Sequence, residues 1–207
     1  MSALCLIVSG GDFAPIPAEV AAADYVIACD RGWQYARRMG LRVDEILGDF
    51  DSAPEPETEI PVERFPVRKD DTDTMLAARR ALELGYRDIA VCCAFGGRLD
   101  HSLANIQTAA FLVRRGARVR LLGAGTDGLA FTGGEAVFPR REGWSLSVFS
   151  VSDVCMGVAI RGPEYDGEGI ELTNRFPLGI SNKWKDSTAR ISVRKGILMV
   201  MESRIPE

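Results

Sequence analysis

The sequence contains a single histidine, His101, and this scarcity limits the chemistry that the chain can perform. A zinc site built on several imidazoles is excluded, and so is any mechanism that needs two histidines. Acid–base work must therefore fall mainly to the 29 aspartate and glutamate carboxylates.

An excess of basic residues is also missing. The 25 lysines and arginines are outnumbered by the 29 acidic residues, so the formal net charge is −4 and the isoelectric point lies near 5.2. General nucleic-acid binders and proteins that bind anionic membranes need a basic face. We therefore expect a small-molecule substrate, and neither nucleic acid nor a membrane as a partner.

Long hydrophobic runs are absent too, and no segment approaches the length that crosses a membrane. At the first residues, Met1-Ser2-Ala3 precedes only the brief apolar run Leu4–Val8, with no basic stretch and no cleavage-like site. We expect a soluble, cytoplasmic protein.

The cysteine pattern gives no support for disulfides or for zinc. The count of five is odd, no C-x-x-C pair occurs, and four of the five lie in apolar runs typical of strands. We expect buried, reduced thiols that behave as small hydrophobic side chains. The cysteines are Cys5, Cys29, Cys92, Cys93 and Cys155.

What the chain does contain is enough apolar material for two modest domains, since 46% of its 207 residues are hydrophobic. Up to about residue 124, apolar β-rich runs alternate with helical patterns, which indicates βαβ units on a parallel sheet. The expected strands are Leu4–Val8, Tyr25–Cys29, Glu45–Leu47, Ile89–Phe95 and Val119–Leu122. The expected helices are Trp33–Met39, Thr74–Leu84 and Leu103–Arg115, each followed by a glycine that can end it.

The second of these helices has a clear apolar stripe. Met75, Ala78 and Leu82 repeat at spacings of three and four residues. Residues at this spacing lie on one face of a helix, so we expect these three to face the sheet.

After Gly123 the composition and pattern of the sequence change: glycine, proline and asparagine become frequent, and helical periodicity disappears. Short alternating runs take over at Trp144–Phe149, Val154–Ile160, Arg190–Val193 and Ile197–Met201. Arg194-Lys195-Gly196 separates the last two runs and predicts a C-terminal hairpin. This half is predicted to be an antiparallel β domain, with a boundary near residues 123–130.

Two short acidic clusters, Gly48–Ser52 and Lys69–Asp73, carry most of the functional information. They concentrate five carboxylates, with a lysine, a serine and a threonine, where strands end and a helix begins. Mg²⁺ takes oxygen ligands from carboxylates, waters and substrate phosphates. A nucleotide bound with Mg²⁺ is therefore the first ligand that the sequence indicates.

Each cluster also has a simpler interpretation. Asp49 and Asp51 project to one side of an extended segment and can share a cation, but Asp-rich turns are also common at protein surfaces. Asp70 and Asp73 lie at a helix start, where negative charge is favoured by the macrodipole. Asp70, Asp71 or Thr72 can serve as the N-cap of that helix.

Glycine-containing turns follow two of the expected strands. Gly96-Gly97-Arg98 offers backbone that can approach a phosphate and a guanidinium that binds phosphate through two hydrogen bonds. A tight turn with Asp100 as the N-cap of the next helix also explains these residues, and the turn and phosphate roles are compatible. Gly10-Gly11 is a weaker signal, and the sequence has neither a G-x-x-x-x-G-K-[ST] loop nor a G-x-G-x-x-G fingerprint.

Four segments occur in a fixed order along nearly the whole chain. They are Gly48–Ser52, Lys69-Asp70-x-Thr72-Asp73, Gly96-Gly97-Arg98-x-Asp100 and Gly179-Ile180-Ser181-Asn182. In this order and spacing they resemble the thiamine pyrophosphokinase family, of the bacterial type.

The resemblance implies a fold and a reaction. The fold is α/β, with a three-layer, parallel-sheet nucleotide-binding domain at residues 1–124 followed by an antiparallel β-sandwich domain that binds thiamine at residues 125–207. The reaction is ATP + thiamine → AMP + thiamine diphosphate, with ATP as co-substrate and Mg²⁺ as cofactor. The family further implies a homodimer that binds thiamine between subunits.

The resemblance also assigns roles to individual residues. By this similarity the metal ligands are Asp49, Asp51 and Asp73, the residues of the ATP and transfer site are Asp30, Lys69, Asp70, Thr72, Gly97, Arg98 and Asp100, and the thiamine-binding residues are Ser181, Asn182 and Trp184. Arg31 stands where many relatives have glycine and can offer its cation to phosphate. Trp184 suits stacking on a thiamine ring, or packing as a half-buried tryptophan of the β domain.

The mechanism that we expect is in-line attack by the thiamine hydroxyl on the β-phosphorus of ATP, with AMP as the leaving group. Such transfer depends mostly on positioning and charge stabilisation. Asp73 and Asp100 are the expected catalytic residues, and Asp100 would orient or deprotonate the hydroxyl.

Other functions fit parts of the pattern. A pyrophosphokinase for another hydroxymethyl heterocycle, such as a pterin, would keep the ATP site, but the segment from Ser181 to Trp184 disfavours it. A non-catalytic nucleotide sensor has less need of the whole set of aspartates. A D-x-D glycosyltransferase leaves the second acidic cluster unexplained.

Overall fold

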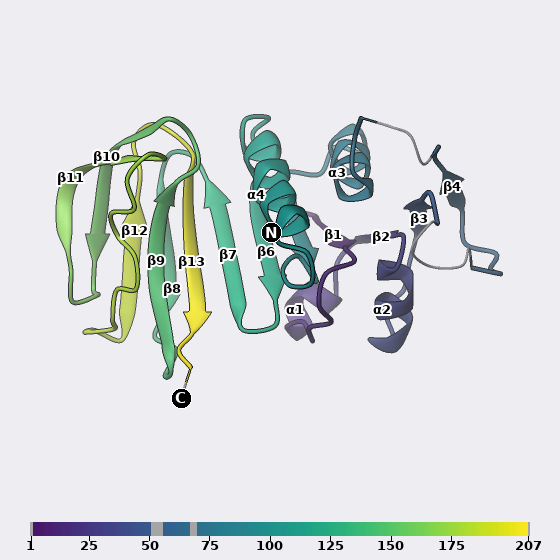
Figure 1. Cartoon of the computed structure of the whole chain (residues 1–207), viewed down its shortest axis with the longest axis horizontal. Coiled ribbons are helices and arrows are strands. Elements are labelled where there is room, and N and C mark those ends of the chain that lie inside the picture. Colours follow the sequence, from purple (N-terminus) through teal and green to yellow (C-terminus); the bar gives the residue numbers. More distant parts are fainter. Residues whose placement is uncertain (1, 51–55, 67–69, 207) are drawn as a thin grey trace. The chain divides into compact units, whose positions relative to one another are not determined.

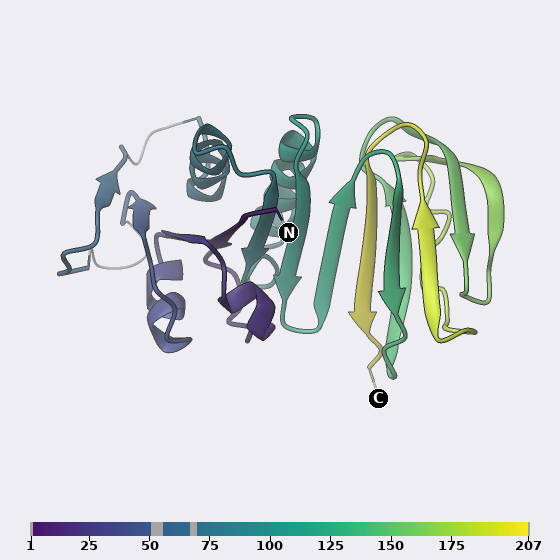
Figure 2. The same cartoon turned by 180° about the vertical axis from the view of Figure 1, so that it is seen from behind.

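The computed structural model describes residues 2–50, 56–66 and 70–206. The chain divides into two compact units, Met1–Ala124 and Gly125–Glu207. In Figures 1 and 2 the colours run from purple to teal over the first unit and from teal through green to yellow over the second. The first contains helices and a parallel sheet and the second contains only antiparallel strands, so the predicted α/β class is confirmed.

The strands of the first unit pair in parallel in the order β4-β3-β2-β1-β5-β6. Their bounds are β1 Leu4–Val8, β2 Tyr25–Cys29, β3 Glu45–Gly48, β4 Val62–Arg64, β5 Asp88–Cys92 and β6 Arg118–Gly123. Every residue of β1 is buried, because a central parallel strand is covered on both faces and is therefore apolar throughout.

Helices cover both faces of this sheet, as Figures 1 and 2 show. Their bounds are α1 Ala18–Ala21, α2 Gly32–Arg38, α3 Asp73–Glu83 and α4 Leu99–Val113. Val20 of α1 and Ala36 of α2 share one apolar cluster with Leu6 and Ala28 of the sheet. Helix α3 packs against α4 and contacts β1, β2 and β3. These layers bring the carboxyl ends of the strands to one edge.

The glycine stops predicted for the three longer helices are confirmed. Gly40, Gly85 and Gly116 have φ values of 67°, 90° and 84°, the left-handed conformation that glycine adopts without steric cost. Helices α2 and α3 end one residue before the predicted position, and α4 ends two residues before it and begins four residues earlier than predicted, at Leu99.

The buried face of α3 differs from the prediction. Ala78 is buried as expected, but Met75 and Leu82 are only partly buried. The buried residues of the helix are Thr74, Ala77, Ala78 and Ala81. Their small side chains allow a close approach to the sheet, so the larger apolar residues lie at the edges of the contact.

Two elements of the first unit were not expected. Helix α1 is a single turn that follows Pro17, too short to show a period. Strand β4 has only three residues at the edge of the sheet, and none of them is buried.

The second unit is a sandwich of two antiparallel sheets. One has the order β7-β13-β9 and the other β11-β10-β12-β8. The bounds are β7 Thr126–Phe131, β8 Glu135–Pro139, β9 Trp144–Ser150, β10 Val154–Arg161, β11 Gly167–Thr173, β12 Thr188–Ser192 and β13 Leu198–Arg204. Leu146 and Leu198 from the first sheet share a core with Val158 and Ile191 from the second.

The predicted C-terminal hairpin is wrong. Strand β12 pairs with β8 and β10, whereas β13 pairs with β7 and β9 in the other sheet. The segment between them crosses from one sheet to the other, and the Met156 N–H of β10 donates to the Lys195 carbonyl at 2.8 Å. Strands β7, β8 and β11 were also missed, because glycines interrupt or border their alternation.

Two further expectations concern cysteines and membranes. All five cysteines are buried thiols that form no disulfide, as predicted. In the part of the chain that the structure describes, no helix is both long and apolar enough to cross a membrane.

A buried glutamate at one end of the sandwich depends on a single arginine. Glu202 is 9% exposed, and its Oε2 lies 3.5 Å from the Arg141 guanidinium, which is 2.6 Å from Asp127. The same guanidinium stacks 3.4 Å above the centre of the Trp144 ring. Burial raises the pKa of Glu202, with Arg141 opposing this effect and Asp127 adding to it.

This raised pKa predicts a pH-dependent contribution to stability. The folded state binds the Glu202 proton more tightly than the unfolded chain, so the contribution is fully present below the unfolded pKa and is lost as the pH rises through the folded pKa. Relative to Glu202→Gln, the wild-type free energy of unfolding should therefore fall as the pH is raised from the ordinary pKa of a glutamate, about 4.3, through the higher folded-state pKa. Urea unfolding of both proteins across this range measures it, and a difference that is constant or grows with pH would contradict it.

Candidate active site

A pocket of about 720 Å³ opens at the carboxyl ends of β1, β2, β3 and β5. The strand order reverses direction at β1, since β2 to β4 follow on one side and β5 and β6 on the other. Ligands of open α/β sheets bind at such a reversal. The pocket is lined by Ser9, Gly10, Gly11, Asp12, Cys29, Asp30, Arg31, Asp49, Asp71, Thr72, Asp73, Thr74, Ala94, Gly96, Gly97, Arg98, His101 and Asn105.

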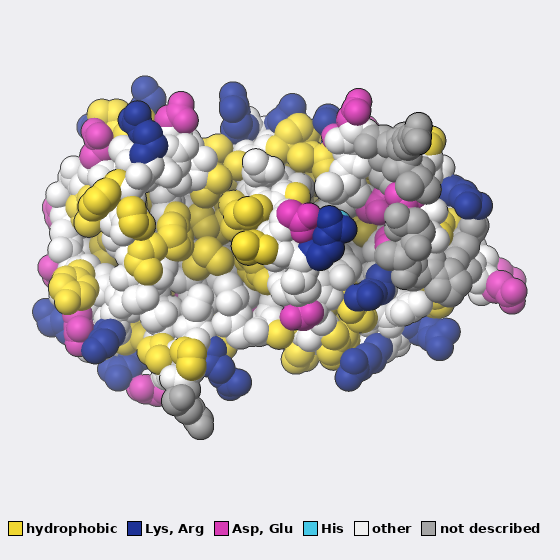
Figure 3. All heavy atoms as spheres, viewed as in Figure 1, with side chains coloured by type: hydrophobic (Ala, Val, Ile, Leu, Met, Phe, Trp, Pro, Cys, Tyr) yellow, Lys and Arg dark blue, Asp and Glu magenta, His cyan; other side chains and the backbone are white. Residues whose placement is uncertain are grey.

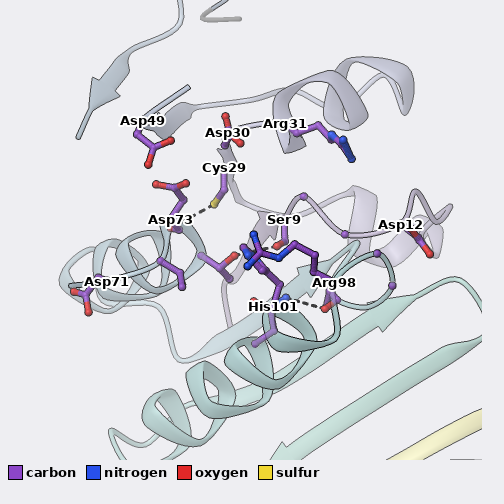
Figure 4. Close-up of a pocket in the computed structure, with 18 residues that line it drawn as sticks. Ser9, Asp12, Cys29, Asp30, Arg31, Asp49, Asp71, Asp73, Arg98 and His101 are labelled. Atoms are coloured by element: carbon purple, nitrogen blue, oxygen red, sulfur yellow. Dashed lines mark hydrogen bonds between the residues drawn. The ribbon is translucent and has the colours of Figure 1, made fainter. Parts of the chain in front are cut away.

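One side of the pocket is acidic. Asp49 follows β3 and Asp73 opens α3, and Figure 4 shows their carboxylates pointing toward one another with Asp30 beside them. Arg98 and His101 come from the start of α4 on the opposite side. The pocket therefore sets carboxylate oxygens against a cation, an arrangement suited to a phosphate bound with a metal ion.

Left-handed backbone marks three of the strand ends at the pocket. Asp30, Phe50 and Cys93 have φ values of 43°, 57° and 52°, and they follow β2, β3 and β5. Residues other than glycine adopt this conformation at a cost, and such strain concentrates at functional sites. The Asp30 N–H donates to the Leu47 carbonyl at 2.8 Å, which holds this residue in place.

Two loops are joined along one edge of the pocket. The N–H groups of Gly11 and Asp12 donate to the carbonyls of Cys93 and Phe95 at 2.9 and 2.8 Å, and the Asn105 amide donates to the intervening Ala94 carbonyl at 2.7 Å. A Cβ on Gly11 would lie 2.5 Å from both loop carbonyls, so only glycine permits this contact. The result is a rigid backbone lining next to Arg98.

Arg98 makes a two-pronged ion pair with Asp100. Its Nη2 and Nε lie 2.6 and 3.1 Å from the two carboxylate oxygens, and both side chains are exposed. The hydrogen bond from Arg98 is the main reason that the pKa of Asp100 is lowered. Arg98 lines the pocket and Asp100 does not.

The start of α3 settles which residue caps the helix. Thr72 is the N-cap, and its Oγ1 accepts a hydrogen bond from the Met75 N–H at 3.2 Å. Asp71 instead pairs with Arg79 at 2.8 Å, and Figure 4 shows its carboxylate turned away from the other aspartates. Asp70 is exposed and does not line the pocket.

The predicted site residues fall into four groups. Those that line the pocket are Asp30, Arg31, Asp49, Thr72, Asp73, Gly97 and Arg98, and those of the first unit that do not are Asp70 and Asp100. Asp51 and Lys69 lie outside the described residues. Ser181, Asn182 and Trp184 belong to the second unit.

In the second unit, Asn182 holds a neighbouring segment. Its side chain is 2% exposed, and its amide accepts from the Tyr165 N–H at 2.9 Å and donates to the Tyr165 carbonyl at 2.7 Å. Ser181 has a left-handed φ of 55° and is exposed. Trp184 is partly buried against the sandwich core, and its indole N–H has no hydrogen-bond acceptor among the described residues.

Several lining residues were not assigned a role from the sequence. Asp12 and Ser9 follow β1, a position that the strand pattern marked. Thr74 and Asn105 lie inside helices on their buried faces, where nothing in the sequence distinguishes them from core residues.

A complete metal site is not formed by the described residues alone, since among them no group of three or more histidine, cysteine, aspartate or glutamate side chains lies close enough to hold an ion. The donors at the acidic side are nevertheless carboxylate oxygens, which suit Mg²⁺. Burial raises the pKa of the Cys29 thiol, which also lines the pocket, well above its ordinary value.

In this α/β unit, carboxylates, an arginine and glycine-containing turns lie around one pocket at the strand ends. This arrangement defines a class of enzymes that transfer phosphate-containing groups from nucleotides. A family profile described as "Thiamin pyrophosphokinase, catalytic domain" matches residues 16–121. The curated thiamine pyrophosphokinase of Bacillus subtilis (strain 168) is 30% identical over 184 residues, which cover 86% of each chain. The chain belongs to the thiamin pyrophosphokinase family.

Solved structures agree with this assignment. The crystal structure of thiamine pyrophosphokinase from Bacillus subtilis matches with a TM-score of 0.84 and 28% identity, covering 98% of this chain and 100% of that one. The enzyme from Geobacillus thermodenitrificans matches with a TM-score of 0.79 and 25% identity, covering 97% of each chain. The family and the enzyme class predicted from the sequence are confirmed.

Proposed function

We propose that the enzyme transfers the pyrophosphoryl group of ATP to the hydroxyl of thiamine, giving thiamine diphosphate and AMP. The observation that carries this proposal is the pocket at the carboxyl ends of β1, β2, β3 and β5, which sets Asp49 and Asp73 opposite Arg98 in a chain of this family. The comparisons give no support for a pterin acceptor or for a sensor without activity.

The proposal that the site binds Mg²⁺ is based on the oxygen atoms that its side chains offer as ligands. Asp49, Asp73 and, beyond the described residues, Asp51 would hold Mg²⁺ through carboxylate oxygens. When bound, the ion would neutralise negative charge on the phosphate oxygens. Asp73 and Asp49 repel one another when no cation lies between them, which lowers the free energy of unfolding. These carboxylates therefore serve metal binding and do not stabilise the fold.

The remaining pocket residues bind and orient ATP. The planar Arg98 guanidinium has five N–H donors, of which Nε and Nη2 bond to Asp100, and the others can bind phosphate. The Gly96-Gly97 backbone can approach a phosphate closely. Arg31 lines the same pocket and adds a second cation. We assign Asp30, Thr72, Asp70 and, outside the described residues, Lys69 to the same ATP site. The thiamine hydroxyl then attacks the β-phosphorus in line with the departing AMP.

Asp100 acts, in this proposal, on the hydroxyl and on Arg98. Its lowered pKa keeps it ionised, which suits orientation of a hydroxyl and of the Arg98 fork. Asp100→Asn is expected to lower kcat about tenfold or more without unfolding the protein. Steady-state kinetics with a circular-dichroism control measures this effect. Near-normal turnover by the folded variant would remove Asp100 from the catalytic residues.

The second unit is proposed to bind thiamine and a second copy of the chain. Its exposed hydrophobic residues include Tyr165, Phe176, Leu178 and Ile180, and Figure 3 shows hydrophobic side chains gathered on the face of this unit toward the viewer. Contiguous apolar surface is typical of interaction sites. Ser181 and Trp184 are the proposed thiamine contacts, and Asn182 shapes this region through Tyr165. A homodimer and a cytoplasmic location stay predictions.

The test is direct. Purified protein is incubated with ATP, Mg²⁺ and thiamine, and AMP and thiamine diphosphate are quantified by chromatography. Equimolar formation of both products supports the proposal. AMP formed only with a pterin or another hydroxymethyl heterocycle would move the acceptor assignment, and ATP binding without turnover on any acceptor would favour a sensor.

A further inference from the structure

A buried pair of hydroxyl groups adjoins Asp73. Ser9, the residue after β1, and Thr74, the second residue of α3, share a hydrogen bond with 2.9 Å between Oγ and Oγ1. The two residues are only 5% and 7% exposed, although both line the pocket. A buried hydrogen bond between residues so far apart in the sequence joins a sheet strand to the first turn of a helix.

The same helical turn is held at each of its first positions. Thr72 caps the helix through the Met75 N–H at 3.2 Å, and the Cys29 thiol of β2 donates to the Asp73 carbonyl at 3.7 Å. The Thr74 hydroxyl adds the link to β1, so Asp73 lies between two anchored neighbours.

We propose that Ser9 and Thr74 are positioning residues for the transfer reaction. Their hydrogen bond fixes the first turn of α3 against β1 and so directs the Asp73 carboxylate toward Asp49. The inference rests on the proposed function, because it assigns Asp73 to the reaction.

The positioning effect comes from the fixed geometry of the hydrogen bond, and not from the burial of the two side chains. Two apolar side chains at these positions would pack as well, whereas a hydrogen bond between two hydroxyls fixes their separation and angle. Removing one hydroxyl leaves the other buried without its partner and releases the turn. A shift of about 1 Å in a catalytic group is enough to slow a reaction about 10²-fold.

The experiment compares Ser9→Ala, Thr74→Val, their double variant and Thr74→Ser with a matched control. The control is Thr108→Val, which removes the hydroxyl of another buried threonine, one that donates to the Ala104 carbonyl of its own helix at 2.9 Å and does not line the pocket. Turnover is measured as above. Calorimetry then measures binding of α,β-methylene-ATP with and without Mg²⁺, a probe whose α–β link resists the transfer.

The expected result separates positioning from folding. Thr74→Val lowers kcat at least about tenfold with the KM for thiamine changed less than about twofold, and Thr74→Ser recovers most of the loss. The kcat of the double variant is no more than about twofold below that of the less active single variant, because each single variant already loses the hydrogen bond between Ser9 and Thr74. In Thr74→Val, Mg²⁺ also increases the affinity for α,β-methylene-ATP less than it does in the wild type. Thr108→Val keeps wild-type kcat.

Other results would overturn the inference. Equal effects of Thr74→Val and Thr108→Val on kcat, or no recovery in Thr74→Ser, would reduce the pair to a structural contact. A wild-type protein that forms no thiamine diphosphate would refute the proposed function instead. In that case equal Mg²⁺-dependent tightening in wild type and Thr74→Val would still overturn the positioning role.

Discussion

Asp73→Asn is expected to lower kcat roughly 10³-fold, the scale on which single charge-stabilising groups matter in phosphoryl transfer. Asp73 opens α3 and turns its carboxylate toward Asp49 at the acidic side of the pocket. An amide of the same shape has no charge to hold a cation against the phosphates. Chromatography of AMP and thiamine diphosphate from single-turnover and steady-state reactions measures the loss.

The stability of this variant should change by less than about 1 kcal/mol, because two effects oppose each other. The helix start loses a favourable charge, worth about 0.3–1 kcal/mol, and the repulsion from Asp49 is relieved. Asp88→Asn is the matched control, since Asp88 begins β5 at the opposite end of the strand and lies 3.6 Å from Arg120. A similar loss of kcat in both variants, or a fall of less than about tenfold in Asp73→Asn, would contradict the assignment.

Gly96→Ala is expected to lower kcat/KM about 10²-fold and to cost about 2–4 kcal/mol of stability. Gly96 has a φ of 90°, and a Cβ there would overlap the Asp12 carboxylate and lie 2.6 Å from the Asp12 Cβ. The Asp12 N–H is bonded to the Phe95 carbonyl, so moving Asp12 separates the two joined loops beside the pocket. Urea unfolding and steady-state kinetics measure the two effects.

Gly116→Ala isolates the conformational part of that cost. Gly116 has a similar φ of 84°, but its added Cβ would meet nothing within 4 Å. This variant should lose only the left-handed penalty of about 1–2 kcal/mol and should keep wild-type kcat/KM. Equal loss of activity in the two alanine variants would mean that contact with Asp12 does not shape the site.

The sequence is most informative where one local pattern has one structural solution. Strands β1 and β2 occur at their predicted bounds, because central parallel strands are continuous apolar runs ended by glycine or charge. The helix stops at Gly40, Gly85 and Gly116 follow equally from a local requirement for left-handed backbone. Four motifs in order were sufficient to indicate the family that the comparisons then showed.

Pairing between distant segments could not be derived in the same way. Adjacent runs around Arg194-Lys195-Gly196 satisfy the local rules for a hairpin, but β12 and β13 join different sheets. Edge strand β4 has no buried residue and therefore leaves no periodic signal. A turn signal reports how the chain bends, and only competition among all the strands decides which neighbours bond.

The sequence by itself determined strands β1 and β2, the three longer helices with their glycine stops, the oxygen-rich chemistry of the strand ends and the family. Only the tertiary structure decided that Ser9 meets Thr74, that the Cys29 thiol donates to the Asp73 carbonyl, and that the Asp73 and Asp49 carboxylates point toward one another, as Figure 4 shows. The physical reason is the range of the interactions. Periodicity, caps and turns depend on a few consecutive residues, whereas the contacts that aim a catalytic side chain join residues from different strands and helices, which only the packed fold brings together.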